Sequence, residues 1–104
     1  MSKTYHQVID KRLLCLVKAS IRKIDEDSAL HRRLSENVQR WSQGKLREQW
    51  QERLAEPWPR LRAELLAENE AGAALRQDAP LGGILTATER AILMQPFRYD
   101  ASAT

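Results

Sequence analysis

The sequence predicts an all-α fold, a small single-domain bundle of five or six short helices with a long N-terminal helix. Three observations support this class. Every clear apolar pattern repeats at intervals of three and four residues, the period of a helix with one buried face. The strict two-residue alternation that indicates strands is absent from the sequence. Each break between patterns carries glycine, proline or acidic residues, which are typical of helix ends.

The first helix has the strongest pattern. Its apolar positions are Tyr5, Val8, Ile9, Leu13, Leu16, Val17, Ile21 and Ile24, and basic residues occupy the opposite face. The acidic run 25–27 ends the pattern and offers carboxylates to the free N–H groups of a second helix, which should start near Ser28. The second apolar stripe consists of Leu30, Leu34, Val38 and Trp41. Gly44 is expected to end that helix as a left-handed C-terminal residue.

Two further helices are separated by a proline hinge. The third keeps four-residue spacing through Leu46, Trp50 and Leu54. Pro57 should end it, because proline lacks an N–H group and disfavours helix at the preceding residue. Pro59 suits the first turn of a fourth helix. The apolar positions of this fourth helix are Leu61, Leu65 and Leu66.

The C-terminal third is less regular. A helix over 68–77 could break or bend at Gly72, and 78–85 should form an ordered loop rather than a helix. Thr86 and Glu89 fit a capping box that starts a last helix. Pro96 is expected to end that helix after about Met94. The prediction is therefore one domain over 1–96 and a flexible tail over 97–104.

Composition and charge narrow the class of protein. The chain has 104 residues, of which 30% are charged, and lacks the roughly 20-residue apolar run of a membrane helix. With no N-terminal signal pattern, a cytoplasmic location is expected. Residues 1–62 hold 14 Lys and Arg against eight Asp and Glu, whereas 63–104 hold three against six. A basic surface could meet an acidic partner or a phosphate backbone.

The sequence offers little for catalysis. Cys15 lies among leucines, and His6 and His31 lie on the polar sides of their helix patterns. Carboxylate pairs such as Glu48 and Glu52 share a helix face but lack the histidines of helical metal sites. No glycine-rich phosphate loop is present, since no strand precedes Gly82-Gly83. No enzyme activity, metal or cofactor is therefore expected.

A DNA-binding role is the alternative prediction. The second and third helices, with Gly44 between them, have the outline of a helix-turn-helix. The residues of its recognition helix would be Lys45, Arg47, Gln49 and Arg53. Glu48 and Glu52 on the same helix would face phosphate and oppose binding. The alternative is thus a small transcriptional regulator of helix-turn-helix type.

Protein binding is the leading prediction. Tryptophan and arginine are enriched at binding hot spots, and apolar loop residues do not stay in water without reason. The candidate partner-binding residues are Trp58, Arg60, Arg62, Arg76, Leu81, Ile84, Leu85 and Arg90. The loop residues either fold back onto the core or form a surface that a partner covers. A homodimer would also bury leftover apolar surface.

A resemblance sharpens this prediction. Residues 75–90 read LRQDAPLGGILTATER. They resemble a signature of short bacterial helical proteins in which a leucine-arginine-glutamine run precedes a small polar pair, proline-phenylalanine, a glycine-containing apolar turn and a capped glutamate-arginine helix. Here Asp78-Ala79 replaces the polar pair and Leu81 the phenylalanine. Residues 50–66 resemble the upstream tryptophan-containing and leucine-rich helices. The resemblance implies an antitoxin-like neutraliser of a partner protein, a toxin encoded nearby in a toxin-antitoxin operon.

Overall fold

The computed structural model describes the backbone of residues 3–102 and the side chains of residues 10–97. This part of the chain forms six α-helices, one short 3-10 helix and no strand, which confirms the all-α class. The elements are α1 (Lys3–Glu26), η1 (Ser28–Leu30), α2 (His31–Gln39), α3 (Lys45–Ala55), α4 (Trp58–Leu66), α5 (Glu70–Gln77) and α6 (Ala87–Ser102). No helix of the described residues is long and apolar enough to cross a membrane. Tyr5, His6, Val8 and Ile9 lie outside the described side chains.

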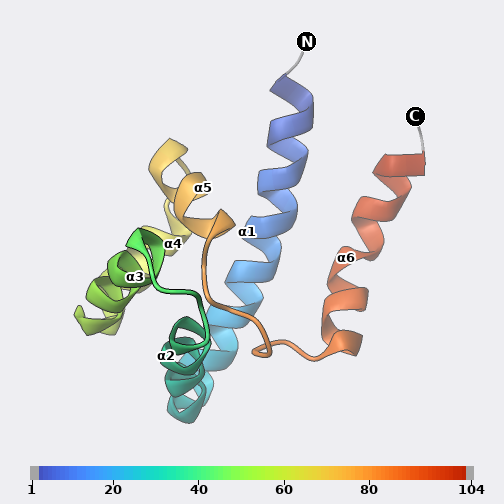
Figure 1. The fold of residues 1–104 in the computed structure, drawn as a ribbon. Coiled ribbons are helices and arrows are strands. Elements are labelled where there is room, and N and C mark those ends of the chain that lie inside the picture. The colour runs from blue at the N-terminus through green and yellow to red at the C-terminus, as the bar shows by residue number, and fades with distance from the viewer. Residues whose placement is uncertain (1–2, 103–104) are drawn as a thin grey trace.

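The long helix α1 is the element around which the others are arranged (Figure 1). Helices α2 to α5 lie on one side of it, and α6 lies on the other. α1 packs against η1, α4, α5 and α6. The connection between α5 and α6 crosses α1 to join the two sides. This crossing segment, residues 78–86, contains the loop that the sequence predicts over 78–85.

The core confirms most of the predicted apolar stripes. Its larger cluster consists of Val17, Ile21, Val38, Trp50, Leu61 and Leu65, and a smaller one of Ile24, Leu34 and Ile84. Leu30, Leu54, Trp58 and Leu66 are partly buried against these clusters. The three-and-four spacing therefore identified the buried faces of α1, α2 and α4, because one face of a surface helix must be withdrawn from water. In the α3 stripe Trp50 is buried, but the prediction is wrong for Leu46, which is 44% exposed.

Local hydrogen bonds fix where the helices start. The Asp27 side chain accepts from the Ala29 amide at 3.1 Å and caps η1, close to the predicted start at Ser28. The predicted capping box is confirmed: Thr86 Oγ1 accepts from the Glu89 amide at 3.1 Å, and Glu89 Oε1 accepts from the Thr86 amide at 2.8 Å. These bonds satisfy amides that have no partner within a helix.

Two predicted helix ends are wrong. α2 ends at Gln39, so Trp41 lies in the connection to α3, and Gly44 is the N-cap of α3 in an extended conformation instead of the C-terminal stop of α2. Pro96 lies inside α6, which continues to Ser102. Proline in a helix removes one backbone hydrogen bond, but here the Arg12 guanidinium donates to the Phe97 carbonyl at 3.0 Å and holds the helix just beyond it.

Candidate functional site

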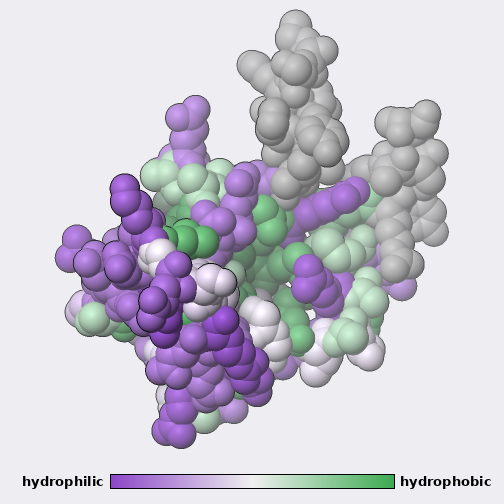
Figure 2. All heavy atoms as spheres, in the orientation of Figure 1, coloured by the Kyte–Doolittle hydropathy of each residue, from purple (hydrophilic) through white to green (hydrophobic). Residues whose placement is uncertain are grey.

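A hollow lies between α1, the loop 78–86 and α6. Figure 2 shows hydrophobic residues gathered in the middle of this face, between the α2–α5 side and α6. The lining residues are Leu13, Leu16, Val17, Ser20, Arg76, Gln77, Ala79, Leu81, Gly82, Gly83, Leu85 and Arg90. Its volume is about 170 Å³, similar to the roughly 150 Å³ of an apolar cavity known to hold benzene. The hollow is therefore large enough for one medium-sized side chain.

The loop wall of the hollow is tied to α2. Asn37 Nδ2 donates to the Pro80 carbonyl at 2.9 Å and to the Gly82 carbonyl at 2.8 Å. Gly83 has φ of +81°, a left-handed conformation that favours glycine. A side chain there would also approach the guanidinium of Arg33, because a Cβ would lie 3.4 Å from Arg33 Nη1. The loop therefore has a defined conformation, in which Asn37 holds the carbonyls of Pro80 and Gly82 in place.

The three aliphatic residues of the loop have different places. Ile84 is 2% exposed and packs with Ile24 and Leu34, so it folds back onto the core. Leu81 and Leu85 are half-buried, and both line the hollow. Of the two outcomes that the sequence left open, Ile84 follows the first, while Leu81 and Leu85 keep one side open to the hollow.

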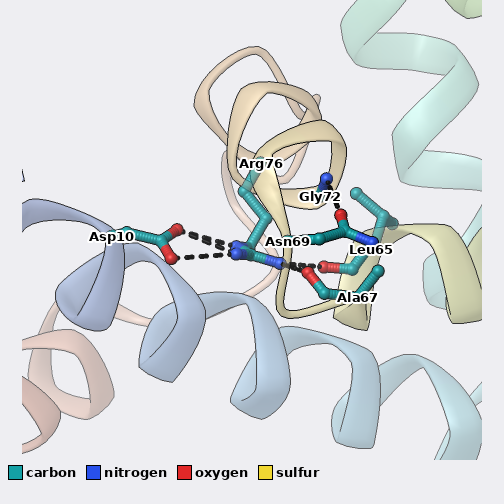
Figure 3. Close-up of polar contacts among 6 residues, drawn as sticks. All are labelled: Asp10, Leu65, Ala67, Asn69, Gly72 and Arg76. Carbon is teal, nitrogen blue, oxygen red and sulfur yellow. Dashed lines mark hydrogen bonds and ion pairs between the residues drawn. The ribbon is translucent and has the colours of Figure 1, made fainter. Parts of the chain in front are cut away.

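Arg76 supports the hollow from inside the protein (Figure 3). Its side chain has no exposed surface. Nε and Nη2 donate to the Asp10 carboxylate at 2.9 to 3.1 Å, and Nη1 donates to the carbonyls of Leu65 and Ala67 at 3.0 and 2.7 Å. All three guanidinium nitrogens therefore have partners within the chain. Because its side chain is also fully buried, Arg76 is a structural support and does not offer its guanidinium to a partner.

The close approach of α5 to the end of α4 makes this arrangement possible. Gly72 is buried, and a Cβ at this position would overlap the Ala67 carbonyl oxygen. Its amide donates to Asn69 Oδ1 at 2.8 Å, which caps α5. The helix does not break or bend off at Gly72, contrary to one predicted option. The glycine instead allows the Ala67 carbonyl to reach Arg76.

Two contacts place the α6 wall of the hollow. Lys23 Nζ lies 2.8 Å from Glu89 Oε1, and Arg12 lies over the Phe97 ring at 5.8 Å. The hydrogen bond from Lys23, followed by that from the Thr86 amide, lowers the pKa of Glu89 to about 2. Glu89 is therefore ionised at neutral pH, and it joins α6 to α1 beside the hollow.

The charge of the lining is positive. It contains Arg76 and Arg90 and no acidic residue. Because Asp10 neutralises Arg76, the charge left is that of Arg90, which is exposed and makes no ion pair with a described residue. Arg33, beside Gly83, is likewise exposed and unpaired among the described side chains.

The predicted partner-binding residues on α4 lie away from the hollow. Asp25 accepts from the Trp58 indole at 3.0 Å and from Arg62 at 2.9 Å, and the Trp58 hydrogen bond is the main cause of a lowered pKa at Asp25. Arg60 is exposed and lies within 4 Å of Glu56 and Glu64. None of Trp58, Arg60 and Arg62 lines the hollow, so the structure does not bring them together with Arg90.

The predicted DNA-binding residues on α3 are only partly available. Lys45 and Gln49 are exposed and Arg47 is half-buried. Arg53 pairs with Glu64 at 3.1 Å and lies near the Trp50 ring. Glu48 and Glu52 are both exposed on the same helix. Their negative charges would repel the DNA phosphates and oppose binding through α3.

Of the candidate catalytic groups, Cys15 and His31 have side chains that the structure describes. Cys15 is a free, half-buried thiol. His31 is half-buried and packs edge to face on Trp58 at 5.2 Å. Within the described part of the chain, no group of three His, Cys, Asp or Glu residues could hold a metal ion.

Sequence reasoning missed the floor of the hollow and its supports. The sequence places Leu13 and Leu16 in the apolar stripe of the first helix, and in the structure both are half-buried and line the hollow. The continuous apolar run 13–17 is wider than one helix stripe needs and was the available signal. Asp10 and Asn37 carried no signal, because a polar residue on a helix looks the same in sequence whether it faces water or a distant partner.

Comparisons with known proteins leave the chain without an assigned family: no family model matches it, and no curated protein or solved structure matches it either.

Proposed function

We propose that the chain is a non-enzymatic protein-binding module that uses the hollow between α1 and α6. The observation that carries this proposal is an open hollow lined by Leu13, Leu16 and Leu85 and by Arg90, which is exposed and forms no ion pair with a described residue. Interfaces combine apolar pockets with arginine in this way. The walls are held by Asn37 and Arg76, so the surface is formed before a partner arrives.

The resemblance of residues 75–90 gives this function its more specific form, an antitoxin-like neutraliser of a toxin, acting in the cytoplasm. The loop and the start of α6, which carry the resemblance, also make two walls of the hollow. A neutraliser needs only to cover the active surface of its partner. A hollow that takes one anchoring side chain suits that task, and it needs no catalytic group of its own.

Co-expression with the product of a neighbouring gene tests the proposal. The tagged chain should co-purify with it, and a toxic neighbour should stop arresting growth when the chain is present. Leu85→Asp should abolish the complex. Leu46→Asp is the matched control, because Leu46 is 44% exposed on α3 and does not line the hollow. Circular dichroism must show that both variants are folded.

Two results would contradict the proposed function. A complex that survives Leu85→Asp and fails with Leu46→Asp would place the binding surface on α3 and refute the use of the hollow. Specific binding to its own upstream DNA at physiological salt, in a gel shift at graded salt, would support the helix-turn-helix alternative instead.

A further inference from the structure

We infer that the partner segment held by the hollow presents a leucine-sized aliphatic side chain directly next to a carboxylate. The inference rests on the proposed function and names the chemistry of the partner. The aliphatic group would enter the hollow, and the carboxylate would meet Arg90 at its edge.

Size and lining select the aliphatic part. The floor consists of Leu13, Leu16 and Val17, and Leu81 and Leu85 form one wall. The one polar side chain of α1 in the lining, Ser20, is buried and donates to the Leu16 carbonyl at 2.8 Å. Its hydroxyl hydrogen is therefore already used. An apolar group of about the size of benzene fits a volume of about 170 Å³.

Charge selects the second part. The guanidinium of Arg76 is saturated by Asp10 and two carbonyls, so it neither attracts nor repels a ligand strongly. Arg90 has no such partner among the described residues, and Arg33 adds a second positive charge outside the Gly83 wall. Glu89, at the start of α6, is occupied by Lys23 and the Thr86 amide, and no acidic residue lines the hollow among the described residues. An incoming carboxylate therefore meets complementary charge, which sets specificity and the association rate.

Three blocked dipeptides test the inference on the full chain by nuclear magnetic resonance titration. Acetyl-Leu-Glu-amide should shift the amide signals of Gly82, Gly83 and Leu85. Acetyl-Leu-Gln-amide, which has the same shape without the charge, should bind about threefold to tenfold more weakly. Acetyl-Ala-Glu-amide, which lacks three carbons of the aliphatic group, should bind about tenfold more weakly or worse.

Arg90→Gln should make the Glu and Gln dipeptides bind equally, because the charge that distinguishes them is gone. Arg60→Gln is the matched control: Arg60 is exposed but does not line the hollow, so the preference should persist. A preference for Glu that survives Arg90→Gln, or wild-type protein that binds both dipeptides equally, overturns the inference.

Other occupants would give different results. Hexanoate binding as tightly as acetyl-Leu-Glu-amide would assign the hollow to a small amphiphilic carboxylate and overturn the protein partner. A dimer in sedimentation, with the same amides shifting as the protein is concentrated, would assign the hollow to a second copy. If Leu85→Asp abolishes the complex with the neighbouring gene product but the chain does not prefer the Glu dipeptide, this inference is refuted and the proposed function stands. If the chain prefers the Glu dipeptide but forms no complex with the neighbouring gene product, the proposed function is refuted and this inference stands.

Discussion

Gly72→Ala should destabilise the protein, although the same change inside most helices is stabilising. Alanine gains about 1 kcal/mol over glycine in a helix interior. Here a Cβ would overlap the Ala67 carbonyl oxygen and lie 3.1 Å from Arg76 Nη1. Overpacking of this kind costs about 1 to 3 kcal/mol. Displacing the carbonyl also disrupts its 2.7 Å hydrogen bond from Arg76, at about 1.5 to 3 kcal/mol for a bond to a charged group.

The balance is a net loss of about 1.5 to 5 kcal/mol, a large share of the about 5 to 15 kcal/mol that stabilises a typical domain. Urea denaturation followed by circular dichroism measures it. Gly82→Ala is the control, because φ at Gly82 is not left-handed and the nearest heavy atom to its Cβ is 3.9 Å away. That variant should stay within about 1 kcal/mol of wild type. A Gly72→Ala protein as stable as wild type would refute the close approach of α5 to Ala67.

Three further changes test the supports of the hollow. Arg76→Lys should cost about 2 to 4 kcal/mol in urea denaturation, because one ammonium cannot serve Asp10 and both carbonyls; an unchanged midpoint would contradict the clamp. Ile84→Asp should abolish the folded state in circular dichroism, since it buries a carboxylate at a site only 2% exposed; a wild-type melting temperature would show that the loop does not dock. Glu89→Gln should lower stability at neutral pH through the lost contact with Lys23. Because the native pKa of Glu89 is about 2 against an ordinary 4.5, this contribution is present above pH 4.5 and disappears as the pH falls towards 2. Urea denaturation from pH 2 to 6 should therefore show the two proteins converging at low pH, and a constant gap would contradict it.

The helices were predictable where local rules decide the structure. The spacing of Val17, Ile21 and Ile24 located the buried face of α1, and Thr86 with Glu89 located the start of α6. The errors arose where distant contacts override local preference. Pro96 should stop a helix on local grounds, yet α6 continues past it.

The candidate site was predictable only in part. In the sequence, the aliphatics of the loop and the two arginines that bracket it indicate Leu85 and Arg90 as partner-binding residues. The supports were not predictable, because Arg76 reaches a carboxylate 66 residues away and Asn37 reaches a carbonyl 43 residues away. Such pairings depend on the assembled fold, which neither periodicity nor turn chemistry encodes.

The crossing of the loop over α1 has a consequence for folding during synthesis. The pairing of Asp10 with Arg76 can join α1 to α5 once residue 76 has been made, whereas the α6 wall needs residue 90. At about 5 to 20 residues per second, these 14 residues take about 1 to 3 s. During that interval Leu13 and Leu16 on the nascent chain face water without their second wall. A partner present at the ribosome would meet the apolar floor before Arg90, the residue that we propose selects its carboxylate.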